Sequence, residues 1–256
     1  MQSREARDYF EFLANLGLTK HLGSMEATRK LIELCHIDGD RHVLDVGCGV
    51  GATPSYLAKK VGCQVTGVDL LEKMIAQSRE RAGQEGVEGR TAFAVADARR
   101  LPFEEGRFDA VVTESVNVFF DDKQEAVREY ARVTKPGGYV GIVEMTWLRP
   151  VTPETKAYYK RVVHADALAA QGWIALLEET GLQDVAGDAH QVEIPQESRG
   201  RFERYGCRGI MKVMLKTLVA VFQDRASREF LKDVTGSLPK DLLGDMGYGV
   251  YAGKKG

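Results

Sequence analysis

Three glycines alternate with other residues directly after a short apolar run in HVLDVGCGVGATP, residues 42–54. Glycine has no side chain, so a loop of this kind lets the backbone come close to a bound ligand. Gly47, Gly49 and Gly51 also fit, in a loose sense, the G-x-G-x-x-G/A fingerprint of dinucleotide-binding loops. The stretch, including Cys48 within it, therefore predicts a site for a nucleotide-like cofactor.

Asp45 helps to distinguish between the possible cofactors. It stands two residues before Gly47, at the expected carboxyl end of the first strand, where open α/β sheets bind ligands. A carboxylate in such a partly desolvated crevice repels a pyrophosphate. S-adenosylmethionine carries a sulfonium cation and an α-ammonium group and has no phosphate. The acidic residue therefore favours S-adenosylmethionine, and a nicotinamide cofactor stays the alternative.

Two further carboxylates follow the next two predicted strands. Asp69 comes 22 residues after Gly47 and can accept both ribose hydroxyls of any adenosine cofactor, so it does not separate the two candidates. Asp97 follows the third predicted strand and can accept a hydrogen bond from an adenine amino group. In the other interpretation, Asp97 is a turn or cap residue.

Strand-like and helix-like segments alternate along residues 42–147. The helices between the strands are predicted to end at Gly62, at Gly83 and before the run Lys135-Pro136-Gly137-Gly138. Such alternation predicts a parallel sheet with helices on both faces. The segments that indicate strands are HVLDV, CQVTGVD, TAFAVAD, FDAVVTESV and YVGIVEMTW.

Two segments lie outside this alternation. Residues 1–36 indicate two amphipathic helices, the second with Ser24 as its N-cap, and residues 196–244 look mainly helical. A further helix and a strand over residues 170–194, and a last strand near the end of the chain, complete the core. We therefore expect a single domain, residues 1–256, with a core at 42–194 and 246–255, an N-terminal helical lid at 1–36 and a helical insert at 196–244.

Five motifs occur in a recognisable order: VLDVGCGVG, GVD, ADARRLPF, FDAVV and RVTKPGG. Together they resemble the class I S-adenosylmethionine-dependent methyltransferases, in particular the small-molecule branch with the ubiquinone/menaquinone and sterol methyltransferases. The resemblance covers roughly residues 42–147 and, more weakly, 170–194. It implies a Rossmann-like α/β fold with a seven-stranded sheet of order 3-2-1-4-5-7-6, whose last strand is antiparallel, and helices on both faces.

The resemblance also implies roles for the motif residues. The glycine loop passes under the methionine portion of S-adenosylmethionine, Asp69 holds the ribose, and Asp97 with Ala98 contacts the adenine. Leu70 and Met74, which follow Asp69, complete the expected cofactor contacts.

The implied function is transfer of a methyl group from S-adenosylmethionine to a small, partly apolar acceptor, with an O, N or C atom as the target. An NAD(P)-dependent oxidoreductase and a module that only senses the cofactor remain the alternatives, because a binding fold need not catalyse. Methyl transfer mainly requires alignment of the acceptor and exclusion of water, and a general base helps only some acceptors. The lack of a catalytic triad is therefore no argument against this function.

The fourth predicted strand ends in TESVNVFF, where the family places residues near the transferred methyl group. Glu114 has three open roles there: general base, partner of the cofactor's ammonium group, or structural hydrogen-bond acceptor. Glu144, which closes the fifth strand, raises the same choice, with the structural role favoured. His21 and His164 are further catalytic candidates because both fall in segments expected to cover the site. The residues expected to bind the acceptor are Tyr9, Asn117, Phe119, Trp147 and Met211.

Composition sets the remaining expectations. The chain has 256 residues, of which 44% are hydrophobic and 28% charged, as in ordinary soluble proteins, and a net charge of −2 gives no reason to expect nucleic acid as a partner. Its four cysteines form no C-x-x-C pair, so we expect no metal site and reduced thiols in a cytoplasm.

A run of basic residues marks the predicted insert. Arg204, Arg208, Lys212 and Lys216 recur every four residues and therefore share one helical face. Such a face is either solvated or belongs to a basic amphipathic helix that touches an anionic lipid surface or an acidic partner. Residues 204–216 are thus a candidate for peripheral membrane contact, and the oligomeric state has no signal in the sequence.

Overall fold

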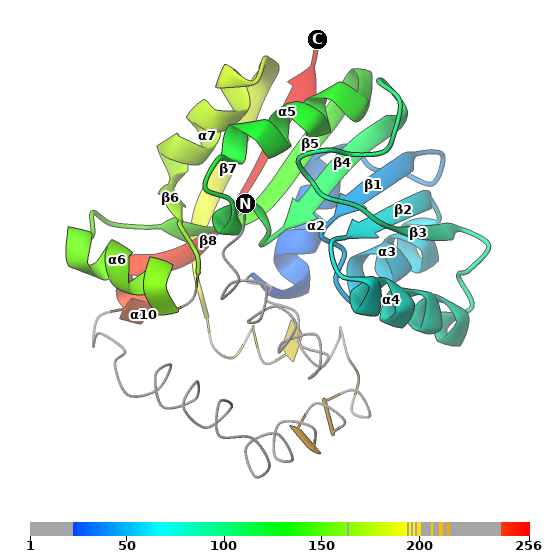
Figure 1. Cartoon of the computed structure of the whole chain (residues 1–256), viewed down its shortest axis with the longest axis horizontal. Coiled ribbons are helices and arrows are strands. Elements are labelled where there is room, and N and C mark those ends of the chain that lie inside the picture. The colour runs from blue at the N-terminus through cyan, green and yellow to red at the C-terminus, as the bar shows by residue number, and fades with distance from the viewer. Residues whose placement is uncertain are drawn as a thin grey trace.

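Five parallel strands form the central part of the sheet (Figure 1). They are β1 (His42–Val46), β2 (Gln64–Asp69), β3 (Thr91–Val95), β4 (Phe108–Glu114) and β5 (Thr134–Trp147). The computed structural model describes residues 23–162, 164–193 and 242–256, together with single positions between 195 and 215.

Two strands extend the sheet beyond β5, and the one next to β5 is antiparallel to both of its neighbours. β8 (Met246–Lys255) pairs with β5 on one side and with β7 (Leu182–Gln191) on the other. The strand order is β3-β2-β1-β4-β5-β8-β7, with the two-residue β6 (Leu168–Ala169) paired to β5 off this path. Counted without β6, this is the expected order 3-2-1-4-5-7-6 with an antiparallel last strand, so that expectation is confirmed.

Helices cover both faces of the sheet (Figure 1). One face carries α2 (Ser24–Leu34), α3 (Ala52–Tyr56) with its π-helical continuation η1 (Leu57–Val61), and α4 (Glu72–Glu85). The other face carries α5 (Lys123–Val133) and α7 (Ala170–Glu179). Three short elements lie near strand ends: η2 (Asn117–Phe119), α6 (Pro153–Val162) and α10 (Leu242–Asp245).

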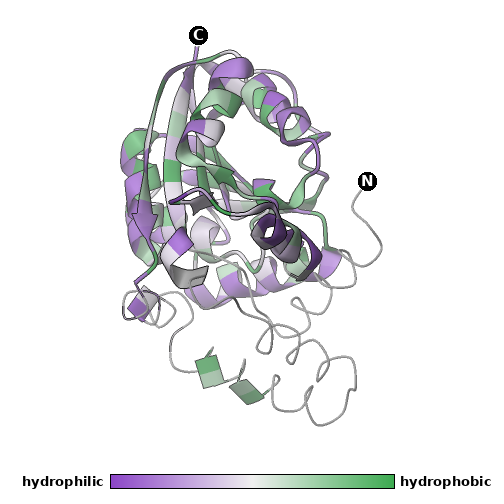
Figure 2. Ribbon diagram, turned by 90° about the vertical axis from the view of Figure 1, so that its left-hand side faces the viewer, coloured by the Kyte–Doolittle hydropathy of each residue, from purple (hydrophilic) through white to green (hydrophobic). Residues whose placement is uncertain are grey.

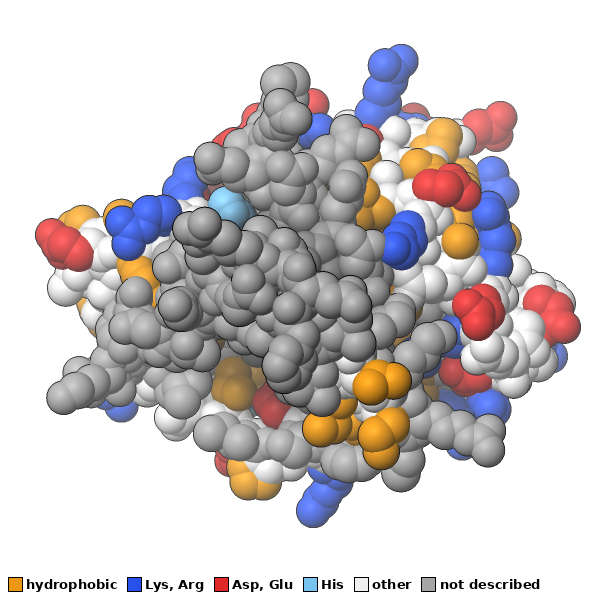
Figure 3. All heavy atoms as spheres, turned by 60° about the horizontal axis from the view of Figure 1, so that its bottom comes forward, with side chains coloured by type: hydrophobic (Ala, Val, Ile, Leu, Met, Phe, Trp, Pro, Cys, Tyr) orange, Lys and Arg blue, Asp and Glu red, His pale blue; other side chains and the backbone are white. Residues whose placement is uncertain are grey.

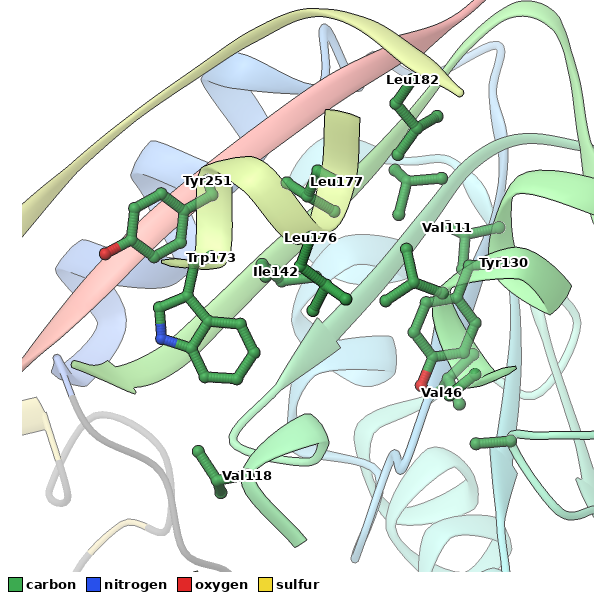
Figure 4. Packing of buried hydrophobic residues seen from close by; sticks show 14 of the residues in the cluster. Val46, Val111, Val118, Tyr130, Ile142, Trp173, Leu176, Leu177, Leu182 and Tyr251 are labelled. Carbon is green, nitrogen blue, oxygen red and sulfur yellow. The ribbon is translucent and has the colours of Figure 1, made fainter. Parts of the chain in front are cut away.

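The core consists of two apolar layers, one on each face of the sheet. Central strands such as β1, with Val43 and Leu44 fully buried, are apolar on both faces because helices cover both. Figure 2 shows hydrophobic residues following the strands, whereas hydrophilic residues gather on the helices. In Figure 4, Ile142 of β5 lies with Leu176 and Leu177 of α7 between the rings of Tyr130 and Trp173.

Three element boundaries differ from the expectations. α4 continues through Gly83 and ends at Gly86, whose φ of 67° provides the left-handed C-cap. The N-cap of α2 is Gly23, not Ser24, because Gly23 has the left-handed backbone (φ 86°) that begins the helix. Helix α5 does end before the run Lys135–Gly138, at Val133, as expected, but β5 already begins at Thr134, so the run lies within the strand, where the pairing with β4 shifts register.

Helix α2 belongs to the core. It buries Ala27 and Leu31 on the sheet, and a Cβ atom on Gly141 of β5 would collide with Leu31 and Cys35. Residues 24–34 are therefore packed structure, which corrects their expected place in a movable lid, and a lid remains a proposal for residues 1–22 only. Residues 1–22 and most of the insert lie outside the described residues. None of the described helices is both long and apolar enough to cross a membrane.

Candidate active site

The glycine loop joins β1 to α3 at the carboxyl end of the sheet. Gly47, Gly49 and Gly51 all have positive φ angles, 75°, 55° and 74°. L-residues with side chains rarely adopt this conformation. The amides of Gly47 and Cys48 both donate to the carbonyl oxygen of Val68, at 2.8 and 2.9 Å, which fastens the loop to the end of β2.

Asp69 links this loop to the start of α4. Its Oδ2 accepts from the Gly49 amide at 3.0 Å, and its Oδ1 accepts from the Leu71 amide at 3.0 Å. Each carboxylate oxygen retains a second lone pair, so two hydroxyl donors can still bind. Burial raises the pKa of Asp69. The carboxylate therefore holds the loop and can also accept from a ribose, which agrees with the predicted role.

Two apolar residues stand beside Asp69. The side chain of Leu70, next to the half-buried Asp69, is 47% exposed, which is unusual for a leucine. Met74 is buried with Val50 of the glycine loop. An open apolar surface beside a hydrogen-bonding carboxylate fits the ribose end of an adenosine group, so the residues present fit the implied cofactor.

Asp97 has a strong partner of its own. Arg99 donates to it through Nη2 at 2.6 Å and through Nε at 3.0 Å, and the Arg99 amide adds a third hydrogen bond. Hydrogen bonding to the Arg99 guanidinium holds the pKa of Asp97 below its ordinary value. Asp97 therefore acts as a turn residue in the structure, because its carboxylate accepts from the amide two residues further on. Its contact with the adenine stays a proposal. The neighbouring Ala98 packs against the core.

Cys48 of the glycine loop and Asp45 of β1 are both buried. Burial, reinforced by the negative charges of Asp45 and Asp69, raises the pKa of the Cys48 thiol well above its ordinary value. A neutral buried thiol neither attacks nor binds a metal well. Cys48 therefore packs as part of the loop, and the described residues contain no group of His, Cys, Asp and Glu that could hold a metal ion.

Glu114 connects three elements at the end of β4. Its carboxylate accepts from the hydroxyl of Thr28 in α2, at 3.1 and 3.2 Å, and from that of Thr53 in α3, at 3.1 Å. Glu114 is buried. Of its three open roles, the structural hydrogen-bond acceptor is therefore observed, and the other two stay proposals.

Glu144 organises the turn after β4 from the neighbouring strand. Its Oε1 accepts from the amides of Val116 and Asn117, at 3.0 and 2.7 Å, and from the Asn117 side chain at 2.9 Å. The hydroxyl of Tyr130 donates to the other end of the Asn117 side chain at 3.1 Å. Asn117 is fully buried and its side-chain amide is engaged by Glu144 and Tyr130, so it positions η2, and its contact with the acceptor stays a proposal.

The structural role that the sequence favoured for Glu144 is thus observed. Glu144 is fully buried, and burial raises the pKa of its carboxyl to about 7. Its second oxygen, Oε2, has no hydrogen-bond partner. The signal in the sequence was its place near the carboxyl end of β5, but a strand position alone does not reveal which loop the side chain supports.

The remaining candidates fall into two groups. Trp147 is buried at the end of β5, Phe119 packs partly buried against the same apolar cluster, and His164 lies between α6 and β6. The loop that follows His164 is tied to η2, because the Asp166 amide donates to the Val118 carbonyl at 2.7 Å. These segments therefore meet at the end of the sheet that also carries Glu114.

The second group is exposed or outside the described residues. Met211, Met214 and Leu215 are 67%, 57% and 62% exposed, and Figure 3, which looks toward this end of the molecule, shows exposed hydrophobic side chains on it. An exposed Met211 is not part of a buried acceptor wall in this structure. The predicted residues outside the described part are Tyr9, His21, Arg204, Arg208, Lys212 and Lys216.

Comparisons with known proteins agree with this geometry. A family model for the methyltransferase domain matches residues 44–142. An uncharacterized protein of Haemophilus influenzae is 29% identical over 225 residues, covering 86% of this chain and 89% of its own length. Tocopherol O-methyltransferase of Arabidopsis thaliana is 37% identical over 107 residues, covering 42% of this chain and 30% of its own length.

A solved structure shows a similar fold. The structure of phosphoethanolamine N-methyltransferase 2 of Haemonchus contortus in complex with S-adenosyl-L-methionine superposes with a TM-score of 0.71 at 22% identity, over 95% of this chain and 56% of that one. This chain spans less than half the length of several curated relatives, such as 42% of methyltransferase GfsG of Streptomyces halstedii. Residues 44–142 thus match a methyltransferase domain, and the strand order and the glycine loop fastened by Asp69 agree with the fold of class I S-adenosylmethionine-dependent methyltransferases.

Proposed function

We propose that the chain transfers a methyl group from S-adenosylmethionine to a small, partly apolar acceptor. The observation that carries this proposal is the loop of three glycines with positive φ angles, which is fixed by the hydrogen bond from the Gly49 amide to Asp69. Printed names of the relatives include both O- and N-methyltransferases, so the methylated atom stays open between O, N and C.

Different residues of the chain would bind different groups of the cofactor. The glycine loop gives the backbone access to the methionine portion, Asp69 accepts from the ribose, and Leu70 offers an apolar contact. The buried carboxylates of Asp45 and Glu114 favour a positively charged ligand over a phosphate. When bound, S-adenosylmethionine supplies a methyl group that is activated by its sulfonium charge.

The protein's contribution to the reaction is mainly alignment and exclusion of water. Thr28 and Thr53 fix the orientation of the Glu114 carboxylate, and Glu144 fixes the turn that follows it. These two sets of hydrogen bonds fix the end of β4 beside the glycine loop. A general base is not required for an acceptor that is already nucleophilic.

In our proposal, the two segments added to the core, residues 1–22 and 196–244, cover this site. The Gly23 amide donates to Glu197 at 2.7 Å, and a Cβ atom on Gly200 would collide with Ser24, so the first part of the insert meets the start of α2. Thr28 of the same helix reaches Glu114. This contact supports residues 1–22 and 196–244 as lids over the acceptor, with a cytoplasmic enzyme and lipid contact through residues 204–216 as further proposals.

Transfer of a labelled methyl group tests the proposed function. The full chain is incubated with methyl-labelled S-adenosylmethionine and a panel of small phenols, amines and lipid-soluble ring compounds. Methylated product from at least one class is the expected result. Tight binding of the cofactor without turnover of any acceptor would favour the sensing module, and tight binding of NAD would favour the oxidoreductase.

A further inference from the structure

Three aromatic residues beyond β5 carry buried polar atoms without hydrogen-bond partners. They are the indole Nε1 of Trp147 and the hydroxyls of Tyr158 and Tyr159, here called the aromatic cluster. Trp147 and Tyr159 meet edge to face with ring centroids 5.0 Å apart, and Tyr158 meets Tyr159 at 6.1 Å. Three unsatisfied groups in one cluster are unusual, because buried polar groups in folded proteins are nearly always paired.

Buried aromatic residues elsewhere in the sheet show the ordinary situation. Trp173 donates from Nε1 to the Met145 carbonyl at 3.1 Å, and the hydroxyl of Tyr251 lies 3.1 Å from that of Thr146. Tyr130 donates to Asn117. The fold therefore satisfies these groups in its core and leaves them unsatisfied at the end of β5.

The aromatic cluster lies at the edge of the sheet that carries the proposed site. Trp147 is the last residue of β5, and both tyrosines stand on α6. Tyr159 and Trp147 share an apolar cluster with Val118 of η2, the turn that Glu144 holds. The cluster also lies outside residues 44–142, which match the family model. A group outside the shared domain is well placed to set which acceptor this chain takes.

We infer that the aromatic cluster binds a neutral oxygen atom of the acceptor, such as a hydroxyl, ether or carbonyl oxygen on an apolar ring. This inference rests on the proposed function. An indole N–H can only donate a hydrogen bond, so the atom bound to it has to be a hydrogen-bond acceptor such as an oxygen. Ala165, Ala167 and Met145 belong to the same buried apolar layer as Trp147 and Tyr159.

A neutral group fits better than an anion because two lysines, one on α5 and one on α6, are already paired with carboxylates. Lys123 lies 3.8 Å from Asp166, and Lys160 lies 3.3 Å from Asp121 and 3.8 Å from Asp166. An anion against the cluster would therefore be buried without an opposite charge, which is costly. A neutral oxygen needs only the donors that the cluster provides.

Indole NMR signals test the inference. The chain has two tryptophans, so a ¹⁵N-labelled sample gives two indole signals, and Trp147→Phe assigns them. The protein, saturated with S-adenosylhomocysteine, is titrated with 4-propylphenol, 3-phenylpropanoate and 3-phenylpropylamine. We expect the phenol to shift the Trp147 signal and to bind more tightly than the anion and the cation, while the Trp173 signal stays in place.

The variants Tyr159→Phe and Tyr251→Phe give a matched pair. Tyr159→Phe should weaken phenol binding roughly three- to tenfold, whereas Tyr251→Phe, which alters a satisfied hydroxyl, should leave it unchanged. The Trp173 signal reports that each variant is folded. No shift of Trp147 with the phenol, tighter binding of the carboxylate, or a full shift caused by S-adenosylhomocysteine alone would overturn the inference. Failure of S-adenosylhomocysteine to bind would instead contradict the proposed function.

Discussion

At the scale of single residues, carboxylates of similar appearance in the sequence have different tasks. Asp69 fastens the glycine loop and keeps acceptor capacity, whereas Asp97 is engaged by Arg99. Glu114 receives two threonine hydroxyls, and Glu144 holds the turn after β4. The sequence indicated where these carboxylates stand along the chain. Their partners come from other elements, so their roles required the structure.

Asp69→Asn should weaken binding of S-adenosylhomocysteine. The amide replaces one acceptor oxygen by a donor, so one charge-assisted hydrogen bond to the ribose is lost, which corresponds to about 1.5–3 kcal/mol. Calorimetric titration measures the change. Asp97→Asn is the control and should have the smaller effect, because the Asp97 oxygens are already bound by Arg99. A dissociation constant for Asp69→Asn equal to the wild-type value would show that Asp69 does not hold the ribose.

Glu144→Gln should change the pH dependence of stability. Burial raises the pKa of Glu144 from 4.5 to about 7 in the folded protein, so folding favours the protonated carboxyl. The stability from this group is complete below about pH 4.5 and is lost as the pH rises through about 7. The glutamine variant does not ionise. Relative to wild type, it should therefore gain roughly 1–3 kcal/mol between pH 5 and pH 8.

Urea unfolding at both pH values measures this difference. Glu129→Gln is the control, because hydrogen bonding to Arg132 lowers the pKa of Glu129 and keeps that carboxyl ionised at both pH values. Its stability difference from wild type should be the same at pH 5 and pH 8. If the free energy of unfolding of Glu144→Gln differs from that of wild type by the same amount at pH 5 and pH 8, the raised pKa of this carboxyl is contradicted.

At the scale of elements, the sequence predicted the core because its local patterns and its packing agree. Apolar runs of strand length alternate with amphipathic segments, and helices on both faces of a parallel sheet require that pattern. Choices between neighbouring residues, such as Gly83 against Gly86 at the end of α4, depend on backbone angles that periodicity does not encode. The hydrogen bonds of Asn117 could not be predicted from its own segment, because its partners, Glu144 and Tyr130, come from β5 and α5.

Gly49→Val should abolish binding of S-adenosylhomocysteine while leaving the sheet formed. Gly49 has φ 55°, and a branched residue both resists this backbone and fills the approach to the loop. Gly83→Ala is the matched control, since a Cβ atom there meets nothing within 4 Å inside a regular helix. It should raise stability by roughly 0.5–1 kcal/mol and keep binding. Normal binding by Gly49→Val, checked by calorimetry and circular dichroism, would show that the loop is wrongly assigned.

At the scale of the whole molecule, we propose that the core holds the cofactor and that two additions cover the acceptor. The sheet order followed from the family resemblance and not from periodicity, since strand order depends on contacts distant along the chain. Helix α2 shows the limit of reading domains from sequence: its amphipathic pattern resembles that of residues 1–22, yet it is buried against β5 and β8. The amphipathic pattern alone therefore did not reveal that α2 packs on the sheet.

Hydrogen exchange should separate these parts. We expect α2 to be as protected as β1 without ligand, because both belong to one buried apolar layer. Residues 1–22 and the middle of the insert should become protected only when S-adenosylhomocysteine and an acceptor are added. Protection of residues 1–22 equal to that of β1 in the ligand-free protein would exclude a lid.

The central claim is that the glycine loop and Asp69 form a site for S-adenosylmethionine and not for a dinucleotide. Calorimetric titration of the full chain with S-adenosylhomocysteine and, separately, with NAD tests it most directly. The account predicts saturable binding of S-adenosylhomocysteine with one molecule per chain, weakened by Asp69→Asn, and no measurable binding of NAD. Binding of NAD as tight as that of S-adenosylhomocysteine would contradict it.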